Sequence, residues 1–436
     1  MGVISCGTTM LDAGEFQGID VLSWDTTAKT ASFTAVAGNG YFVNTTSGAI
    51  TVTLPSSPSA GDQVAVQDYA GTWADNNVTI ARNGSNIAGA ALDATLKNSN
   101  ESVVLIYVDG TRGWQTIIDS TQSVTGVNFV TATGGTVSTC GDYKIHTFTG
   151  PGSFNVTCAG NPSGSTNIDY MVVAGGGGTG YGGAGGGGFR ESSGAASGCY
   201  TTSPLGSGVS PVPVSVQGYP ITVGAGGAEG PSGVYHGGGS SGSNSVFSTI
   251  TSTGGGGGGS YQCRSPGPNA GKTGGSGGGA GFDASSPVGG VGNTPPVSPP
   301  QGQPGGGAPA GGAQTAGGGG GATQAGQTQP AGIPKTGGYG GDGAGTAINP
   351  AAGTPGPSPS LKYFAGGGGG GANTDPGGVP PAPGGDGGGG DAPGVVFAPG
   401  EDGTANTGGG GGGGDANGPT GANGGSGIVV IRYKYR

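Results

Sequence analysis

Residues 171–190, MVVAGGGGTGYGGAGGGGFR, open a glycine-saturated region that closes just before the terminal stretch 428–436, IVVIRYKYR. Most of the 113 glycines in this chain of 436 residues lie between these two ends. A composition of this kind without a repeat is usual in disordered segments, but grouping into runs indicates an ordered architecture. The runs are 175–178, 185–188, 254–259, 317–321, 366–371, 387–390 and 408–414.

The free-energy cost of ordering these runs has to be offset by backbone hydrogen bonding. Each ordered glycine costs roughly 0.5–1 kcal/mol more than alanine, so about a hundred of them cost on the order of 50–100 kcal/mol. Glycine has no side chain to bury, so N–H···O=C bonds worth a net ~1 kcal/mol each must compensate. The absence of a strict Gly-X-Y period excludes collagen. The sequence therefore predicts a bundle of polyglycine-II-like helices whose connecting turns carry the variable chemistry.

The predicted fold class is mainly β with few or no α-helices, in four segments. Residues 1–33 are expected to be an attachment or oligomerisation segment. Residues 34–120 are expected to form a small antiparallel β module, and residues 121–170 a β connector. Residues 171–436 are expected to form the glycine-rich domain, closed by a strand at 427–436.

The composition disfavours several functional classes. Only 8% of the residues are charged, and the net charge is −10 with a pI near 4.4. A nucleic-acid-binding protein would show a basic patch or stripe, so no nucleic-acid partner is expected. No run of about 18 apolar residues is present, so no membrane insertion is expected. The first residues lack the basic and apolar regions of a secretory signal.

Six strand-like runs, rich in β-branched residues, indicate the β module. Turn pairs such as Asn83-Gly84 and Asp109-Gly110 separate them. Trp73 and Trp114 are expected to pack in a core or between subunits, with sugar stacking as the alternative. The runs are 41–45, 49–54, 63–69, 77–82, 102–108 and 114–118.

The β module resembles a module found in virion structural and tail-fibre proteins of marine and cyanobacterial tailed phages. The residues that carry the resemblance are 35–87 together with 103–117, VVLIYVDGTRGWQTI. The resemblance implies a fibre-forming, commonly homotrimeric structural protein of the virion with no enzymatic role. It also implies contacts with other tail or capsid proteins through the N-terminal region.

The two ends of the glycine-rich region carry a second resemblance. The opening strand 168–178, IDYMVVAGGGG, paired with the closing strand 425–436, GSGIVVIRYKYR, is similar to the ends that bracket glycine-rich adhesin domains of phage fibres. This implies polyglycine-II packing with receptor-contacting loops between the runs. The expected receptor is a host-surface polysaccharide or an outer-membrane protein.

Catalytic and metal-binding patterns are weak. His146 and His236 are the only histidines, so neither a Ser-His-Asp triad nor a histidine-based zinc site is expected, and no cofactor is predicted. Residues 337–345 approach a calcium-binding nonapeptide but lack a convincing second copy. Reduced thiols are expected at Cys6, Cys140, Cys158, Cys199 and Cys263, with bridges Cys140–Cys158 and Cys199–Cys263 as the alternative.

Aromatic and charged residues between the glycine runs are the candidates for receptor contact, because tyrosine gives a large contact area at low entropic cost. A further aromatic segment lies at 395–397. The alternative is that these residues plug the ends of the bundle. The candidates are Arg190, Tyr200, Tyr235, His236, Tyr261, Arg264, Tyr363 and Phe364.

Three hypotheses follow for the function. The first is a phage tail fibre or fibre-tip adhesin, located in the virion. The second is a purely structural virion protein, such as a capsid fibre or decoration, without receptor binding. The third is a free binding protein such as an ice-binding polyglycine bundle, against which the β module counts.

Overall fold

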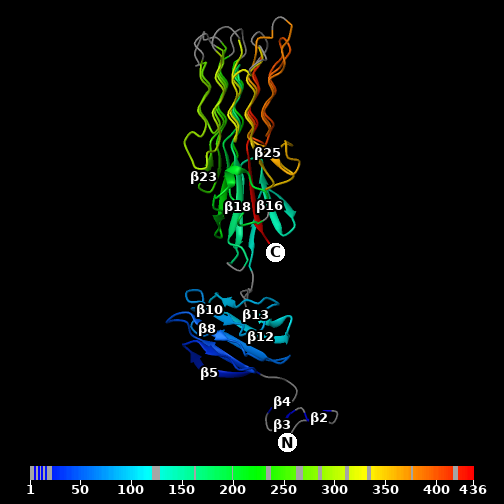
Figure 1. Ribbon diagram of the computed structural model, residues 1–436. Helices are drawn as coiled ribbons and strands as arrows, with labels where there is room; N and C mark the ends of the chain where they lie inside the picture. The colour runs from blue at the N-terminus through cyan, green and yellow to red at the C-terminus, as the bar shows by residue number, and fades with distance from the viewer. Residues whose placement is uncertain are drawn as a thin grey trace. The chain divides into compact units, whose positions relative to one another are not determined.

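The structure is a computed structural model in which the chain divides into two compact units (Figure 1). Unit 1 comprises Met1–Asn128 with Asn161–Ser163, and unit 2 comprises Phe129–Gly160 with Gly164–Arg436. The residues that the structure describes are 4–5, 8–9, 11–12, 15–16, 22–119, 128–161, 164–198, 200–231, 237–261, 269–282, 287–309, 314–330, 335–374, 377–415 and 421–436.

Unit 1 is built from strands, and its connections are short. Two two-residue pairs come first, followed by longer strands that coincide with all six of the predicted runs. The strands are β1 (Ile4–Ser5), β2 (Thr8–Thr9), β3 (Leu11–Asp12), β4 (Glu15–Phe16), β5 (Ser23–Lys29), β6 (Phe33–Thr34), β7 (Asn39–Val43), β8 (Ile50–Thr53), β9 (Gln63–Asp68), β10 (Val78–Ala81), β11 (Ala94–Leu96), β12 (Ser102–Asp109) and β13 (Gly113–Asp119).

From β5 to β10 the chain of unit 1 alternates between two sheets. Because of this alternation, strands that are adjacent within a sheet run parallel. One sheet has the order β13-β12-β9-β7-β5 and the other β11-β10-β8-β6. Strands β5, β7 and β9 run parallel, as do β6, β8 and β10. In these two sheets, β11, β12 and β13 join by antiparallel pairing. The prediction of an antiparallel module is therefore wrong for β5 to β10, because each short connection there crosses to the other sheet and a strand pairs with the next but one.

The core of unit 1 lies between its two sheets and includes both predicted tryptophans. Trp73 and Trp114 are fully buried, among side chains such as Val43 and Ile80. The indole Nε1–H of Trp73 donates to the backbone carbonyl of Val43 at 3.1 Å. The prediction of core packing is confirmed for both residues.

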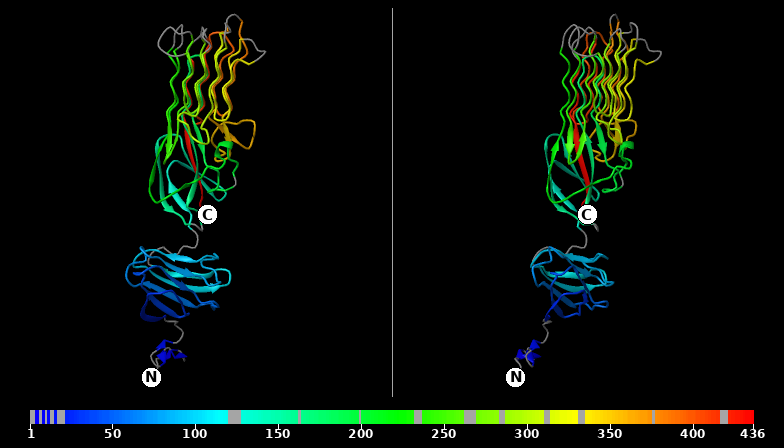
Figure 2. Two further views of the ribbon diagram at one scale, coloured as in Figure 1. Left: turned by 60° about the vertical axis from the view of Figure 1, so that its left-hand side comes forward. Right: turned by 90° about the vertical axis from the view of Figure 1, so that its left-hand side faces the viewer.

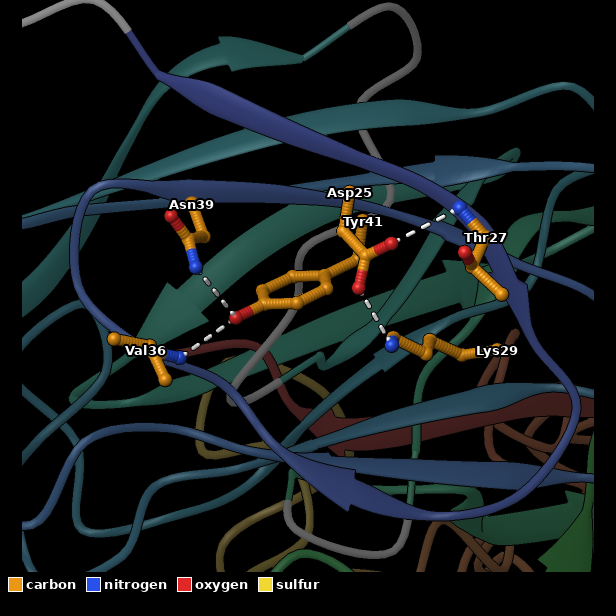
Figure 3. Close-up of polar contacts among 6 residues, drawn as sticks. All are labelled: Asp25, Thr27, Lys29, Val36, Asn39 and Tyr41. Carbon is orange, nitrogen blue, oxygen red and sulfur yellow. Dashed lines mark hydrogen bonds and ion pairs between the residues drawn. The ribbon is translucent and has the colours of Figure 1, made fainter.

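Polar contacts connect β5, β7 and the turn before β7 in unit 1 (Figure 3). The Tyr41 hydroxyl accepts hydrogen bonds from the Val36 backbone N–H at 2.9 Å and from the Asn39 side chain at 3.4 Å. On the other side of the ring, Lys29 Nζ lies 2.6 Å from an Asp25 carboxylate oxygen and 5.8 Å from the Tyr41 ring centroid. The hydrogen bond from Lys29 lowers the pKa of Asp25.

A second fixed point of unit 1 is the buried carboxylate of Asp68 at the end of β9. It accepts hydrogen bonds from five backbone N–H groups, which ties the turn after β9 to the turn before β12. The donors are Ala70, Gly71, Thr72, Trp73 and Asn100, at 2.9–3.4 Å.

Unit 2 begins as a β-sandwich and continues into the glycine runs (Figure 2). The described residues contain one short 3-10 helix and no α-helix, so the predicted fold class, mainly β, is confirmed. The elements are β14 (Val130–Thr133), β15 (Thr136–Cys140), β16 (Tyr143–Phe148), β17 (Gly152–Ala159), β18 (Asn167–Val173), β19 (Phe189–Glu191), η1 (Pro204–Gly206), β20 (Val212–Pro213), β21 (Gly218–Thr222), β22 (Ser245–Phe247), β23 (Ile250–Ser252), β24 (Ala344–Thr346), β25 (Lys362–Phe364) and β26 (Ile428–Lys434).

The two ends of the glycine-rich region pair in the middle of one sandwich sheet. That sheet has the order β15-β16-β26-β18-β19, and it packs against β14-β17-β21-β22-β23 through aromatic side chains such as Phe154 and Tyr433. Strands β18 and β26 are antiparallel, with Val173 opposite Ile428. The predicted pairing of opening and closing strands is confirmed. The strands of the expected connector, 121–170, belong to unit 2.

The glycine runs leave the sandwich side by side (Figures 1 and 2), and their hydrogen bonds rotate among three neighbours. In the run 182–188, every third N–H donates to the same neighbouring segment, so the partner changes at each residue. Written as N–H donor→carbonyl acceptor, the bonds are 182→259, 185→256 and 188→253 to the first neighbour, 183→317 and 186→320 to the second, and 184→411 and 187→408 to the third, with N···O distances of 2.7–3.0 Å.

This rotation explains why the runs consist of glycine. Each segment is surrounded on three sides by backbone, so a side chain would enter a neighbouring chain. A Cβ atom on Gly183 would lie 2.1 Å from the Gly368 carbonyl oxygen, and one on Gly368 would lie 1.8 Å from that of Gly411. The hydrogen bonding that the sequence requires to offset the ordering cost is present in the described runs.

Candidate binding site at the distal end of the glycine runs

The glycine runs have two chemically different ends. The proximal end joins the sandwich at β18 and β19 (Figure 1). The distal end holds Tyr181, Tyr261 and Asp415. The run 182–188 leads from Tyr181 at the distal end to Phe189 at the proximal end.

A buried aromatic stack supports the distal end. The Tyr181 and Tyr261 rings lie 4.8 Å apart, and Phe282 stacks on Tyr261 at 5.6 Å. The Tyr181 hydroxyl donates to the Gln314 backbone carbonyl. Burial raises the pKa of Tyr181 well above its usual value. The stack therefore works as a plug between glycine runs and offers little surface to a partner.

Beside this plug, the buried carboxylate of Asp415 holds an exposed aromatic residue. Asp415 accepts hydrogen bonds from the Phe397 backbone N–H at 2.7 Å and from the Thr374 hydroxyl at 2.9 Å. The Phe397 side chain is 61% exposed, and that of Val395, two residues earlier, is 64% exposed. Asp415 directly follows the run 408–414, and Thr374 lies three residues after the run 366–371, so the carboxylate ties Phe397 to the rigid part of the bundle.

Phe397 also has a strained backbone, with φ of 62°. The left-handed region costs a residue other than glycine about 1–2 kcal/mol. Such a conformation persists only where the surroundings impose it, and it is a reason to look for function. An exposed, strained aromatic residue at the end of a rigid scaffold is well suited to contact a partner. We call Val395, Phe397 and their support, Thr374 and Asp415, the distal tip.

The structure separates the contact candidates predicted from sequence. Tyr261 and Phe364 are buried, which is the plugging alternative that the sequence left open. Arg190 lies half-buried on β19, and the Tyr363 ring packs against Gly345 and Gly356, both at the proximal side. Tyr235, His236 and Arg264 lie outside the described residues.

Tyr200, another candidate, belongs to a buried polar cluster at the proximal end. The guanidinium of Arg432 lies between two rings, 4.7 Å from Tyr143 and 4.9 Å from Tyr200. Burial raises the pKa of Tyr200. Asp169, opposite Arg432 in the sheet register, accepts hydrogen bonds from the Ser197 backbone N–H and hydroxyl, both at 2.6 Å. These contacts fasten the segment after β19 to the sandwich and give Tyr200 a structural role.

Glu191 completes this cluster at the end of β19. Its carboxyl group accepts hydrogen bonds from the Ser203 backbone N–H at 2.8 Å and from the Thr346 hydroxyl. Burial, the largest effect, raises the pKa of Glu191 to about 7. The group links the 3-10 helix η1 and strand β24 to the sandwich sheet.

The described residues offer little to a metal ion. No group of three or more His, Cys, Asp or Glu side chains comes together among them. Both ring nitrogens of His146 are engaged, by the Gly134 carbonyl at 2.7 Å and by the Tyr433 hydroxyl at 3.0 Å. Cys140 and Cys158 are free thiols, whereas Cys6, Cys199 and Cys263 lie outside the described residues.

The second unit thus defines a mainly β protein in which a sandwich carries glycine runs that lie side by side and presents their distal end. The chain belongs to the family described as a glycine-rich domain, which matches residues 147–434. The match begins within β16 and ends at Lys434, the last residue of β26, so it includes the strands that open and close the glycine-rich region.

No curated protein matches the chain. Among the described residues, no helix has the length and apolar character needed to cross a membrane.

Proposed function

We propose that the protein is a phage tail fibre or fibre-tip adhesin, a structural component of the virion that binds a host-surface receptor through its distal tip. The receptor is a surface polysaccharide or an outer-membrane protein. The protein has no enzymatic role in this proposal. The family match supports the glycine-rich architecture, and the resemblance of the β module supports the assignment to a phage.

We further propose that the glycine runs are polyglycine-II helices. The support is the rotation of hydrogen-bond partners with a period of three residues in 182–188, since polyglycine-II-type helices have three residues per turn. A scaffold bonded in this way on three sides holds its end rigidly. Rigid presentation lowers the ordering cost of binding.

The observation that carries the recognition role is the distal tip itself. Phe397 is exposed, its backbone is strained, and Asp415 holds it in place. Aromatic residues dominate the energetics of protein interfaces.

The N-terminal part is proposed to attach the protein to the particle, as a homotrimer. Strand β5 lies at the edge of its sheet, and an open edge is a template for pairing with another chain. Trp24 on this strand is 40% exposed. The molar mass from light scattering tests this part of the proposal, with a monomer as the result that contradicts it.

A purely structural virion protein is the second candidate. The burial of Tyr261 and Phe364 favours it, because two of the aromatic residues between the runs then serve packing alone. In that case the distal tip would have no ligand.

Fluorescently labelled full-length protein should bind saturably and selectively to certain strains in a panel of marine bacteria and cyanobacteria. Phe397→Gly, which suits a φ of 62°, should weaken binding more than about tenfold, as expected for an aromatic hot spot. Val216→Ala is the matched control, because Val216 is 65% exposed but lies between β20 and β21.

Unchanged binding by Phe397→Gly would refute recognition through the distal tip. Failure of the wild-type protein to bind any strain would favour the purely structural alternative.

A further inference from the structure

A pocket of about 440 Å³ opens at the proximal end of the glycine runs, away from the distal tip. Its volume lies within the range of about 300–1,000 Å³ of small-molecule sites. Strands β15 and β16, two turns of the glycine-rich region and the first residue of β26 form its walls. The lining residues are Thr136, Ser138, Thr147, Thr149, Asn349, Ala351, Ala352, Gly353, Thr404, Ala405, Asn406, Thr407 and Ile428.

The pocket is rich in polar groups that have capacity for a ligand. The hydroxyls of Thr136, Ser138, Thr149 and Thr404 make no hydrogen bond to another described residue. The side-chain oxygen of Asn406 accepts a hydrogen bond from Ser426, and its amide N–H₂ has no partner within the described ranges.

Hydrogen bonds within the walls preform the pocket. The Asn349 side chain donates to the Thr147 hydroxyl at 2.9 Å and accepts from the Ala351 backbone N–H at 3.0 Å. On the facing turn, the Thr407 hydroxyl donates to the Thr404 carbonyl at 2.7 Å. These bonds hold the turns that form the walls, so the walls need little ordering when a ligand binds.

The lining residues favour an uncharged ligand that has both hydrogen-bonding groups and apolar surface. No charged side chain lines the pocket, so an ionic ligand would lose hydration without gaining a counter-charge. Hydroxyl and amide groups alternate with the methyl groups of threonine, alanine and isoleucine. A sugar ring matches this pattern, because its hydroxyl groups surround a ring whose C–H faces are apolar.

We propose that this pocket binds a neutral sugar residue. The site goes beyond the proposed function, since it uses none of the residues of the distal tip and would serve a purely structural virion protein as well.

Saturation-transfer NMR on the full-length protein tests the proposal. The probes are the methyl glycosides of glucose, galactose, mannose and N-acetylglucosamine, with glucuronate and glucosamine as charged comparisons. At least one neutral glycoside should give saturable transfer, and the charged probes should bind at least about tenfold more weakly.

Two kinds of variant locate the binding. Ser138→Trp should fill the pocket and abolish transfer, whereas Val137→Trp, on the opposite face of the same strand, should bind like the wild type. The double variant Thr136→Val with Thr149→Val keeps the shape but removes two hydroxyls, and it should weaken binding by about fivefold or more. It also covers the case in which Ser138→Trp fails to fold.

Three results would overturn the proposal: no transfer to any neutral glycoside, equal binding of charged and neutral probes, or wild-type binding by the folded double variant. Loss of cell binding by Phe397→Gly, or its retention, leaves these measurements unaffected, so the two proposals fail independently.

Discussion

Replacement of Gly368 by alanine should destabilise unit 2 through a contact that the bundle cannot relieve locally. The Gly368 N–H donates to the Ala184 carbonyl at 2.8 Å, and its carbonyl accepts from the Gly319 N–H at 2.8 Å. A Cβ atom there would lie 1.8 Å from the Gly411 oxygen, whereas real Cβ contacts are essentially never below 3.0 Å. The run 366–371 would have to move by about an ångström, and backbone hydrogen bonds to its neighbours would lengthen or break.

The expected loss is about 3–5 kcal/mol in the free energy of unfolding. Overpacking alone costs about 1–3 kcal/mol, and each buried backbone group left without a partner adds about 1–3 kcal/mol. The lower entropy of the unfolded alanine variant returns only about 0.4–1 kcal/mol. For a unit of this size the melting temperature should fall by roughly 5–8 °C.

Differential scanning calorimetry of the full-length protein measures this loss, with Gly307→Ala as the matched control. A Cβ atom on Gly307 would meet its nearest atoms at 3.4 Å, the Pro287 carbonyl oxygen, and 3.9 Å, the Thr328 hydroxyl. This control should be neutral or slightly stabilising. A melting temperature within about 2 °C of the wild type for Gly368→Ala, or an equal fall for both variants, would refute the reasoning.

Three further predictions concern single side chains. Glu191→Gln should flatten the pH dependence of the urea-unfolding free energy of unit 2. The folded-state pKa of Glu191 is raised from 4.5 to about 7, so the protonated carboxyl group stabilises the folded state. This contribution to the unfolding free energy, about 3 kcal/mol at most, is fully present below pH 4.5 and is lost as pH rises through 7. Asp68→Ala should cost unit 1 about 2–4 kcal/mol, because five backbone N–H groups lose their acceptor, and tryptophan fluorescence in urea measures it. Phe397→Gly should leave the melting temperature unchanged or slightly higher, since glycine relieves the left-handed strain.

Each of these predictions has a contrary result. A wild-type unfolding free energy that does not fall between pH 5 and pH 8 would remove the role given to Glu191. An unchanged urea midpoint in Asp68→Ala would show that water replaces the lost acceptor. A fall of several degrees in Phe397→Gly would show that the ring stabilises the fold and is not strained for binding.

Much of unit 2 could be predicted from local sequence. The glycine runs require backbone hydrogen bonding whatever the fold, because they have no side chains to bury. The strands 168–173 and 428–434 are apolar and β-branched, and they bracket the runs, so their pairing follows from closing the domain. Trp114 was recognisable as a core residue because it begins the β run 114–118, whereas Trp73 lies between the runs 63–69 and 77–82, where only its large apolar ring indicated a core position.

The direction in which the strands of unit 1 pair could not be predicted from the sequence. A strand has the same alternating pattern in a parallel and in an antiparallel sheet, and nothing in the connection between β7 (Asn39–Val43) and β8 (Ile50–Thr53) tells whether the chain returns to the same sheet or crosses to the other. Crossing, repeated from β5 to β10, produced the parallel pairs.

The candidate sites depend most on tertiary structure. Sequence determined that aromatic residues occur between the glycine runs, but their exposure depends on neighbours far along the chain. Tyr261 is buried by Tyr181 and Phe282, whereas Phe397 is held outward by Asp415 and Thr374. The neutral pocket likewise assembles from stretches far apart in the sequence: the edge strand β15 with its neighbour β16, two polar turns and the first residue of the inner strand β26. Local sequence therefore determined the scaffold, because glycine runs have no side chains and can be ordered only by hydrogen bonds between their backbones. Which side chains face a ligand was decided only by the tertiary packing.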